Sequence, residues 1–255
     1  MNFSPTKDTV SILVSALLEA RRAGRPVAGD VARQLDLTVE EAYRIQAEVA
    51  RTIGQIGGFK VANKPDAPRI MAPIFRKDIL TAPAVLDVPS DEDIGIELEV
   101  GFRIERPLPD RAFPDRRDAI AKCLSALPVI EIVRTRLPMD VTPVLKLADN
   151  QINGGLVVGT PITDWTSLAL GPVSAGLDLG DERVLDGDAN VPGGDAFENF
   201  LVLEEMIGDH CGGLQTGQIV ITGSLNGLPY VKAGIDILGR IDGFGEVSLR
   251  LNTAS

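Results

Sequence analysis

Hydrophobic and polar residues alternate through residues 94–102, and this period of two predicts a β-strand with two different faces. One face carries only apolar side chains, those of Ile96, Leu98, Val100 and Phe102. Glu97 and Glu99 fall together on the other face. Neighbours on one face of a strand lie about 6.5–7 Å apart at Cα, because a strand rises about 3.3–3.4 Å per residue. Two like charges at that spacing repel each other, and burial would make the repulsion costly.

The N-terminal part of the chain has helical spacing instead. Apolar residues recur every three or four positions through residues 6–23, which predicts an amphipathic helix that ends near Gly24. This segment is too short for a membrane span and does not have the pattern of a secretory signal. A second helix is expected after Thr38, which has the spacing of a capping box with Glu41, and it should end before Gly54.

From about residue 79 onward, short apolar runs are separated by glycine, proline and aspartate, which predicts many short strands. A short helix is expected near the end of residues 105–127, and a longer one within residues 195–213. We therefore expect an α+β protein, with an N-terminal α/β region at residues 1–78 and a β-rich core at residues 79–255.

Composition narrows the possible partners. The chain has a formal net charge of -11 at pH 7, which argues against nucleic acid or an anionic membrane as a partner. An anionic substrate would need a bound cation or a placed lysine or arginine. The two cysteines, Cys123 and Cys211, have no paired spacing and are expected to be unpaired thiols in a reducing compartment. The protein is therefore expected in the cytoplasm.

Glu131 lies inside the apolar run of residues 127–133, which predicts a buried strand. An isolated buried carboxylate costs several kcal/mol, so it should be protonated, ion-paired or bound to a metal. A structural glutamate with a partner is one reading. The other interpretation is that Glu131, together with Glu97 and Glu99, binds one divalent cation. Oxygen ligands suit Mg²⁺ or Mn²⁺. A zinc site is disfavoured, because the chain has one histidine and no cysteine cluster.

Four other places in the sequence have polar residues that could belong to a site or to ordinary structure. Lys60 follows paired glycines in a short apolar stretch, so it is either a strand lysine reaching solvent or a lysine beside an anionic substrate. Asp78 has the position of a cap or turn residue. Asp149 and Asn150 begin a polar loop, which is either an ordinary turn or the mouth of a pocket. His210 falls at an expected helix end and is interpreted as structural.

Several segments, in this order, resemble the 2-keto-4-pentenoate hydratase and 4-oxalocrotonate decarboxylase family, relatives of the fumarylacetoacetate hydrolases. They are EEAYRIQ, GFKVA, IELEVGFRIERPLP, VIEIVRTRL, DNQINGGLVVG and GQIVITGSLNGLPYVKAG. The resemblance extends from the second helix to the C-terminus, and its most specific part is the Glu-x-Glu strand followed by a later glutamate in an apolar strand. It implies a twisted, mixed β-barrel-like core of the fumarylacetoacetase C-terminal type and a homo-oligomer.

The resemblance also implies roles for individual residues. It assigns Mg²⁺ or Mn²⁺ binding to Glu97, Glu99 and Glu131. It assigns acid–base work to Lys60 and Asp78, and substrate binding to Asp149, Asn150 and Thr222. The residues that follow Lys60, at positions 61–65, depart from the pattern of the family's hydratases, which bears on the identity of the substrate.

The expected activity is hydration of a 2-hydroxy-2,4-dienoate to a 4-hydroxy-2-oxo acid by a metal-dependent lyase. The oxo and carboxylate oxygens of such an acid can chelate one cation. Two alternatives stay open at this point. One is decarboxylation of a 4-oxalocrotonate-type 2-oxo acid, and the other is a catalytically silent subunit in a complex with a related pathway enzyme.

Overall fold

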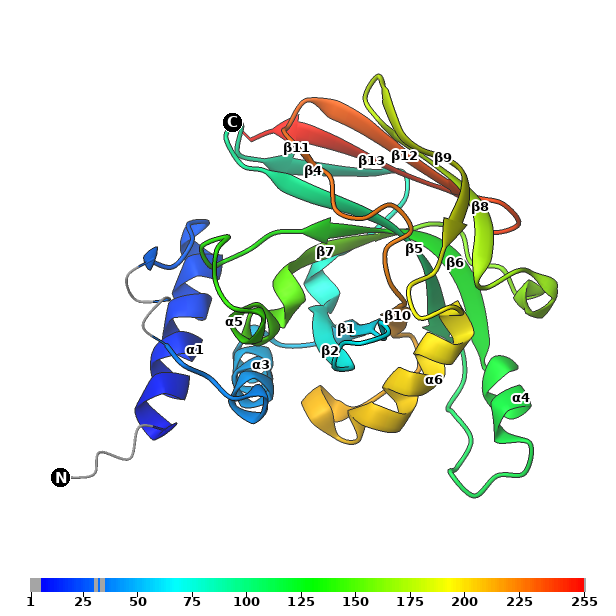
Figure 1. The fold of residues 1–255 in the computed structure, drawn as a ribbon, viewed down its shortest axis with the longest axis horizontal. Coiled ribbons are helices and arrows are strands. Elements are labelled where there is room, and N and C mark those ends of the chain that lie inside the picture. The colour runs from blue at the N-terminus through cyan, green and yellow to red at the C-terminus, as the bar shows by residue number, and fades with distance from the viewer. Residues whose placement is uncertain (1–5, 30–31, 33–34, 255) are drawn as a thin grey trace.

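The computed structural model describes residues 6–29, 32 and 35–254, and two β-sheets form its centre (Figure 1). The larger sheet has the order β2-β1-β10-β5-β6-β7-β3, and β11 pairs with β5. Its strands are β1 (Ile56–Ala62), β2 (Ile70–Phe75), β3 (Ile79–Thr81), β5 (Ile94–Ile104), β6 (Leu124–Val133), β7 (Asn153–Val158), β10 (Ile219–Ile221) and β11 (Tyr230–Val231). The smaller sheet has the order β4-β13-β12-β8-β9. Its strands are β4 (Ala84–Val88), β8 (Pro172–Leu179), β9 (Glu182–Asn190), β12 (Ile235–Ile241) and β13 (Gly245–Thr253).

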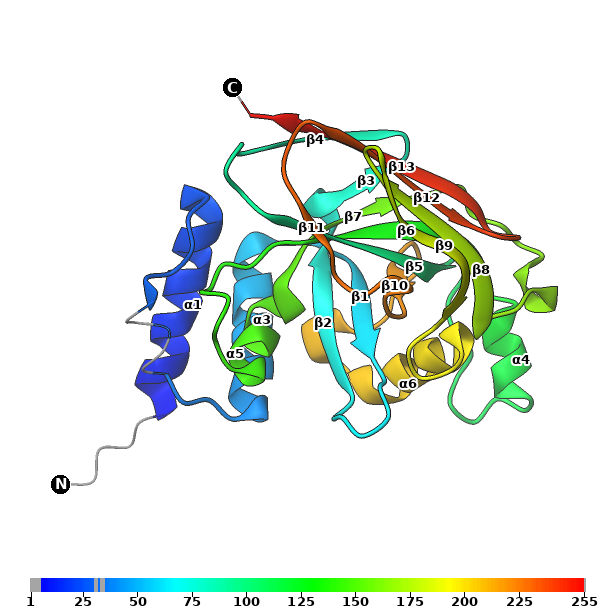
Figure 2. The ribbon, with the colours of Figure 1, turned by 45° about the horizontal axis from the view of Figure 1, so that its top comes forward.

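Helices lie beside and below the sheets, as Figures 1 and 2 show. They are α1 (Thr6–Ala23), α3 (Val39–Ile53), α4 (Arg116–Ala121), α5 (Pro143–Ala148) and α6 (Ala196–Ile207). The two N-terminal helices begin and end as predicted. The Thr38 side chain accepts a hydrogen bond from the backbone N–H of Glu41, and the Glu41 side chain accepts one from the backbone of Thr38. None of the helices in the described residues is long and apolar enough to cross a membrane.

The main hydrophobic core joins the two sheets and α6. Leu98 and Phe102 of β5 lie in it together with Val247 of β13, and all three side chains are fully buried. Phe200 of α6 meets Phe102 edge-on, with ring centroids 5.8 Å apart. A second core lies among α1, α3 and α5. The expected α+β class, with a mixed β core and a helical N-terminal region, is confirmed; within the described residues the sheets do not close into a barrel.

The opposite face of the large sheet is the one that carries Glu97, Glu99 and Glu131. A small apolar cluster on this face includes Val129, which precedes Glu131 by two residues on β6, and Ile221 of β10. The boundary expected at residue 78 stays a prediction. β1 lies before that boundary and pairs in parallel with β10, which lies after it.

Gly58 sets how closely β1 and β10 approach. We expect Gly58→Ala to lower the free energy of unfolding by about 1–3 kcal/mol, the usual cost of overpacking. A Cβ at this position would lie 2.0 Å from the carbonyl oxygen of Ile219, which is fixed backbone. The matched control is Gly176→Ala in β8, where the nearest atom, the Leu185 oxygen, is 3.7 Å away. Urea unfolding measures both variants, and equal losses would contradict this account of β1 packing.

Candidate metal centre

Three carboxylates converge on the face of the large sheet that lies away from the main core. In the antiparallel pair β5 and β6, Glu97 is directly opposite Glu131, and Glu99 lies two residues further along β5. Glu99 and Glu131 are buried and Glu97 is partly buried. One carboxylate oxygen from each residue lies within 4.8 Å of the others. The strand alternation that separated these glutamates from the apolar residues thus also turns them toward one another.

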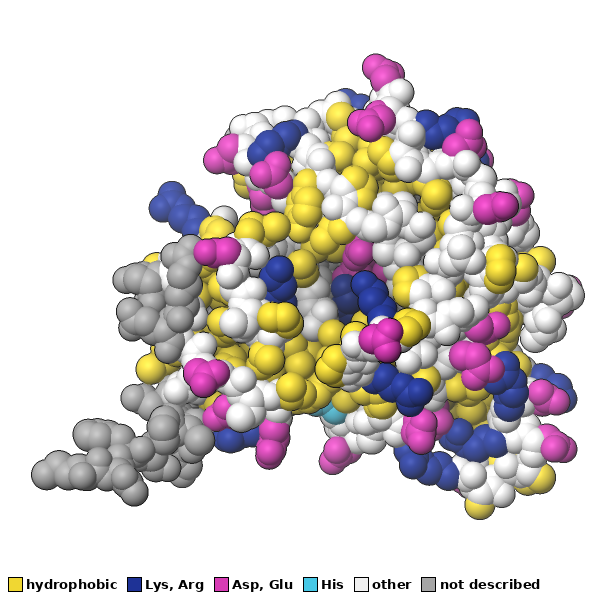
Figure 3. All heavy atoms as spheres, viewed as in Figure 1, with side chains coloured by type: hydrophobic (Ala, Val, Ile, Leu, Met, Phe, Trp, Pro, Cys, Tyr) yellow, Lys and Arg dark blue, Asp and Glu magenta, His cyan; other side chains and the backbone are white. Residues whose placement is uncertain are grey.

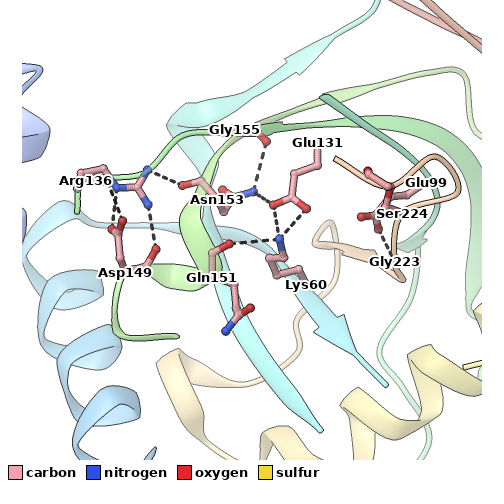
Figure 4. Close-up of polar contacts among 11 residues, drawn as sticks. Lys60, Glu99, Glu131, Arg136, Asp149, Gln151, Asn153, Gly155, Gly223 and Ser224 are labelled. Carbon is pink, nitrogen blue, oxygen red and sulfur yellow. Dashed lines mark hydrogen bonds and ion pairs between the residues drawn. The ribbon is translucent and has the colours of Figure 1, made fainter. Parts of the chain in front are cut away.

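Lys60 of β1 completes the cluster. Its Nζ lies 2.6 Å and 2.7 Å from the two carboxylate oxygens of Glu131, and 3.5 Å from the carbonyl oxygen of Gln151 (Figure 4). Burial alone would lower the pKa of Lys60, but the charges of Glu131, Glu97 and Glu99 outweigh it, so the pKa lies above its usual value. Lys60 is therefore a cation, and with all three carboxylates ionised the cluster has a net charge of about -2. A divalent cation would balance that charge.

Two of the three carboxyl groups in this cluster have raised pKa values. Burial, followed by the charge of Glu131, raises the pKa of Glu97 from 4.5 to about 7. Burial and the same neighbour raise the pKa of Glu99 well above its usual value, although Glu99 also accepts a 2.6 Å hydrogen bond from the backbone N–H of Gly223. Protons and a divalent cation therefore compete for these oxygens, and the cation should bind more tightly as the pH rises.

We expect the metal-free protein to lose stability as the pH rises from about 4.5 to 7. The folded state holds the proton of Glu97 more tightly than the unfolded chain does, so this contribution is complete below pH 4.5 and is lost through the folded pKa of about 7. The shift corresponds to about 3 kcal/mol at 1.36 kcal/mol per pKa unit. Urea unfolding in EDTA from pH 5 to 8 measures the loss. Saturating Mg²⁺ should remove it, and an equal decline with and without the metal would contradict the assignment.

The donor set fits Mg²⁺ or Mn²⁺. Ligand oxygens on one octahedral Mg²⁺ lie about 3–4 Å apart, because the bonds are about 2.0–2.1 Å long. The observed spacing, within 4.8 Å, needs only small side-chain shifts to reach that geometry. Carboxylate oxygens are hard ligands, and the chain's one histidine does not join the cluster, because His210 bonds instead to the Oε1 of Gln46 at 3.0 Å.

A left-handed turn supports the cluster. Asn150, Gln151 and Ile152 have φ angles of 52°, 52° and 55°. This conformation costs about 1–2 kcal/mol for each non-glycine residue. At the end of the turn, the side-chain N–H of Asn153 donates to Glu131 at 2.8 Å. The sequence reasoning did not single out Asn153 or Arg136, which bonds to this turn, although both lie inside segments that resemble the family.

The remaining predicted site residues have different surroundings. Asp78 is paired with Lys77 at 3.3 Å, and no bond joins it to Lys60 among the described residues. Asp149 is fully buried and bonds to Arg136. Asn150 is also buried, and within the described residues its side-chain nitrogen and oxygen have no hydrogen-bond partner. The Thr222 hydroxyl donates to the carbonyl oxygen of Val100 at 2.8 Å.

A cavity of about 770 Å³ lies beside the cluster, between α1 and the sheets. Its walls include Asp78, Gly154 and Tyr230, but not the three glutamates. Tyr230 lies between the cavity and the glutamate cluster, because it lines the cavity and also pairs with Gly95, two residues before Glu97. Acidic and basic side chains meet in a recess near the middle of the face shown in Figure 3.

The sequence is similar to curated proteins over nearly its whole length. It is 30% identical over 254 residues to 2-keto-4-pentenoate hydratase 2 of Dechloromonas aromatica (strain RCB), covering 92% of this chain and 94% of that one. The chain belongs to the 2-keto-4-pentenoate hydratase family. A 2-keto-4-pentenoate hydratase of Paraburkholderia xenovorans (strain LB400) is 26% identical over 254 residues, covering 91% of each chain. No protein-family model matches the chain.

A solved structure shows the same fold as this family member. The 4-oxalocrotonate decarboxylase from Pseudomonas putida G7, complexed with magnesium and adipate, superposes with a TM-score of 0.82. It is 18% identical and the match covers 98% of this chain and 100% of that one. At this identity the likeness establishes the fold. The curated relative at 30% identity confirms the family resemblance inferred from the sequence, whereas the roles of the site residues stay predictions.

Proposed function

We propose that the protein is a divalent-metal-dependent hydratase that adds water to a 2-hydroxy-2,4-dienoate and forms a 4-hydroxy-2-oxo acid. The observation that carries the proposal is the convergence of Glu97, Glu99 and Glu131 beside the cationic Lys60. The names of the similar proteins support the substrate class. The magnesium in the similar decarboxylase structure supports the kind of ion.

Mg²⁺ or Mn²⁺ would be held by Glu97, Glu99 and Glu131. When bound, the ion supplies Lewis-acid polarisation of the substrate's oxygen at C2. Three carboxylates in a poorly solvated site are costly without a cation, and the raised pKa values of Glu97 and Glu99 express that cost. The glutamates are thus arranged for binding an ion more than for stability of the empty protein.

The chain's own residues bind the substrate and move protons. Hydration of 2-hydroxypenta-2,4-dienoate needs a proton to move from the 2-hydroxyl to C5, and water then adds to C4 with a proton at C3. We assign these transfers to Lys60 and Asp78, since Lys60 is a partly buried ammonium beside the carboxylates. The unpartnered amide of Asn150 needs a hydrogen-bond partner, and a substrate oxygen would provide one. We also assign Thr222, whose hydroxyl oxygen can accept a further bond, to substrate binding.

The direct test is turnover by the purified protein with Mg²⁺ and freshly made 2-hydroxypenta-2,4-dienoate. The ultraviolet absorbance of the dienol should disappear and 4-hydroxy-2-oxopentanoate should accumulate. Release of CO₂ from 2-oxohex-3-enedioate without hydration would replace this proposal with a decarboxylase. Calorimetry with oxalate, a chelating mimic of a 2-oxo acid, tests the silent-subunit alternative: a protein with no catalytic site should not bind oxalate only when Mg²⁺ is present.

A homo-oligomer, a complex with a related pathway enzyme and a cytoplasmic location are further parts of the proposal. Sedimentation of the purified protein, alone and mixed with the related enzyme, measures the first two.

A further inference from the structure

The left-handed turn Asn150–Ile152 delivers two contacts to the candidate metal centre. The carbonyl oxygen of Gln151, within the turn, lies 3.5 Å from the Nζ of Lys60. The side chain of Asn153, directly after the turn, donates to Glu131 at 2.8 Å and to the carbonyl oxygen of Gly155 at 3.3 Å. This one segment therefore contacts both members of the Lys60–Glu131 ion pair (Figure 4).

Arg136 joins the two ends of that turn. One terminal nitrogen donates to the backbone carbonyl of Asp149 at 2.9 Å, before the turn, and the other donates to the carbonyl of Asn153 at 2.7 Å, after it. The Nε of Arg136 donates to one carboxylate oxygen of Asp149 at 2.7 Å, and its backbone N–H donates to the other at 2.8 Å. Arg136 is 8% exposed and Asp149 is fully buried, so solvent does not compete with these bonds.

The turn needs such support. Ile152 is β-branched and has a φ of 55°, where branched side chains are rarely found. Its backbone N–H bonds to the carbonyl of Asp149, and its carbonyl accepts from the N–H of Arg134, each at 2.9 Å. A strained segment of this kind persists when its surroundings over-determine it. A planar guanidinium with several donors can bridge both ends, whereas a single ammonium cannot reproduce that geometry.

We propose that Arg136 and Asp149 are positioning residues of the candidate metal centre, because together they hold the turn that fixes Glu131 and Lys60. This inference rests on the proposed function, since it concerns the same site. It also changes the expected role of Asp149. Both of its carboxylate oxygens are bound within the protein by Arg136, so Asp149 acts on substrate through the turn and not by direct contact.

The test compares Arg136→Lys and Arg136→Met with the native protein. The readout is the Kd of Mn²⁺, measured by calorimetry on metal-free protein. Both variants should bind Mn²⁺ about 10–100-fold more weakly, the usual effect of losing support behind a metal ligand. In the metal-free state, the amide proton of Ile152 should exchange faster by a similar factor, because its hydrogen bond closes the turn.

Arg116→Met is the matched control. Arg116 likewise joins a loop to a carboxylate, with bonds of 2.7 Å and 2.8 Å to Glu204 and a bond of 3.1 Å to the carbonyl of Asp110, away from the glutamate cluster. This variant should lose stability without a change in the Kd of Mn²⁺. If Arg116→Met weakens Mn²⁺ binding as much as Arg136→Met does, the effect is general destabilisation and the inference is wrong.

A double-mutant cycle tests whether Arg136 affects Mn²⁺ binding through the contact between Asn153 and Glu131. Asn153→Ala removes the contact to Glu131, so adding Arg136→Lys should weaken Mn²⁺ binding by much less than it does in the native background. Fully additive effects would overturn the proposed route. The native protein's own Kd separates the two levels of the argument. Native protein that binds no Mn²⁺ overturns the proposed function, whereas normal Mn²⁺ binding by Arg136→Lys overturns only the positioning role.

Discussion

Replacing Glu131 with glutamine is expected to reduce metal-dependent turnover by at least about a thousandfold, which corresponds to about 4 kcal/mol of transition-state stabilisation. The substitution keeps the shape of the side chain but removes one of the three negative charges that face one another within 4.8 Å. It also leaves Lys60 without the carboxylate that binds it at 2.6 Å and 2.7 Å. Both changes weaken the hold on a divalent ion, so the Kd of Mn²⁺ should rise together with the loss of turnover.

Glu204→Gln controls for the loss of a paired, partly buried carboxylate outside the site. Glu204 binds Arg116 through both of its oxygens, and neither residue belongs to the glutamate cluster. This variant should keep native turnover and native Mn²⁺ affinity. Turnover by Glu131→Gln within tenfold of the native value, at saturating metal, would show that Glu131 is not a ligand.

Much of the fold could be predicted from local patterns in the sequence. The capping box of Thr38 and Glu41 depends on three neighbouring positions, so its geometry follows from spacing alone. The alternation along β5 separates Glu97 and Glu99 from the core for the same reason. The register that places Glu131 opposite Glu97 depends on pairing between distant strands. The sequence alone does not specify that register, and the convergence of the three glutamates was inferred from charge and from the family resemblance.

The contacts that Arg136 makes with the left-handed turn could not be predicted from the sequence, for a physical reason. Arg136 bridges the turn through two backbone carbonyls, and any residue type supplies a carbonyl, so no residue pattern marks those two partners. The turn at Asn150–Ile152 uses a backbone conformation that asparagine adopts readily but isoleucine does not. Asp149 and Asn150 are adjacent, yet the side chain of Asp149 is bonded to Arg136, whereas the side-chain amide of Asn150 has no partner within the described residues. Only the three-dimensional arrangement separates a positioning role from a direct one.

The glutamate cluster and Lys60 together explain why the site is costly to the empty protein. An ordinary core would contain apolar residues where Glu99 and Glu131 are buried. Burial, and after it the charge of Glu131, raises the pKa of Glu97 and of Glu99, and Lys60 supplies the compensating positive charge. Lys60 therefore has two proposed roles that can be separated experimentally: stabilising the metal-free fold through its ion pair with Glu131, and transferring protons in the proposed reaction.

Lys60→Met should lower the free energy of unfolding of the metal-free protein by about 3–5 kcal/mol at pH 8, the usual effect of removing one partner of a buried ion pair. The loss should be smaller at pH 5, because protonation of Glu97 and Glu99 removes two of the charges that Lys60 compensates. Turnover at saturating Mg²⁺ should fall by about 10²–10⁴-fold, the range for loss of a positioned proton donor or acceptor. Lys122→Met, at an exposed lysine, is the control and should change neither quantity. A Lys60→Met protein with a pH-independent loss of stability would refute the electrostatic role, and turnover within tenfold of the native value would refute the catalytic one.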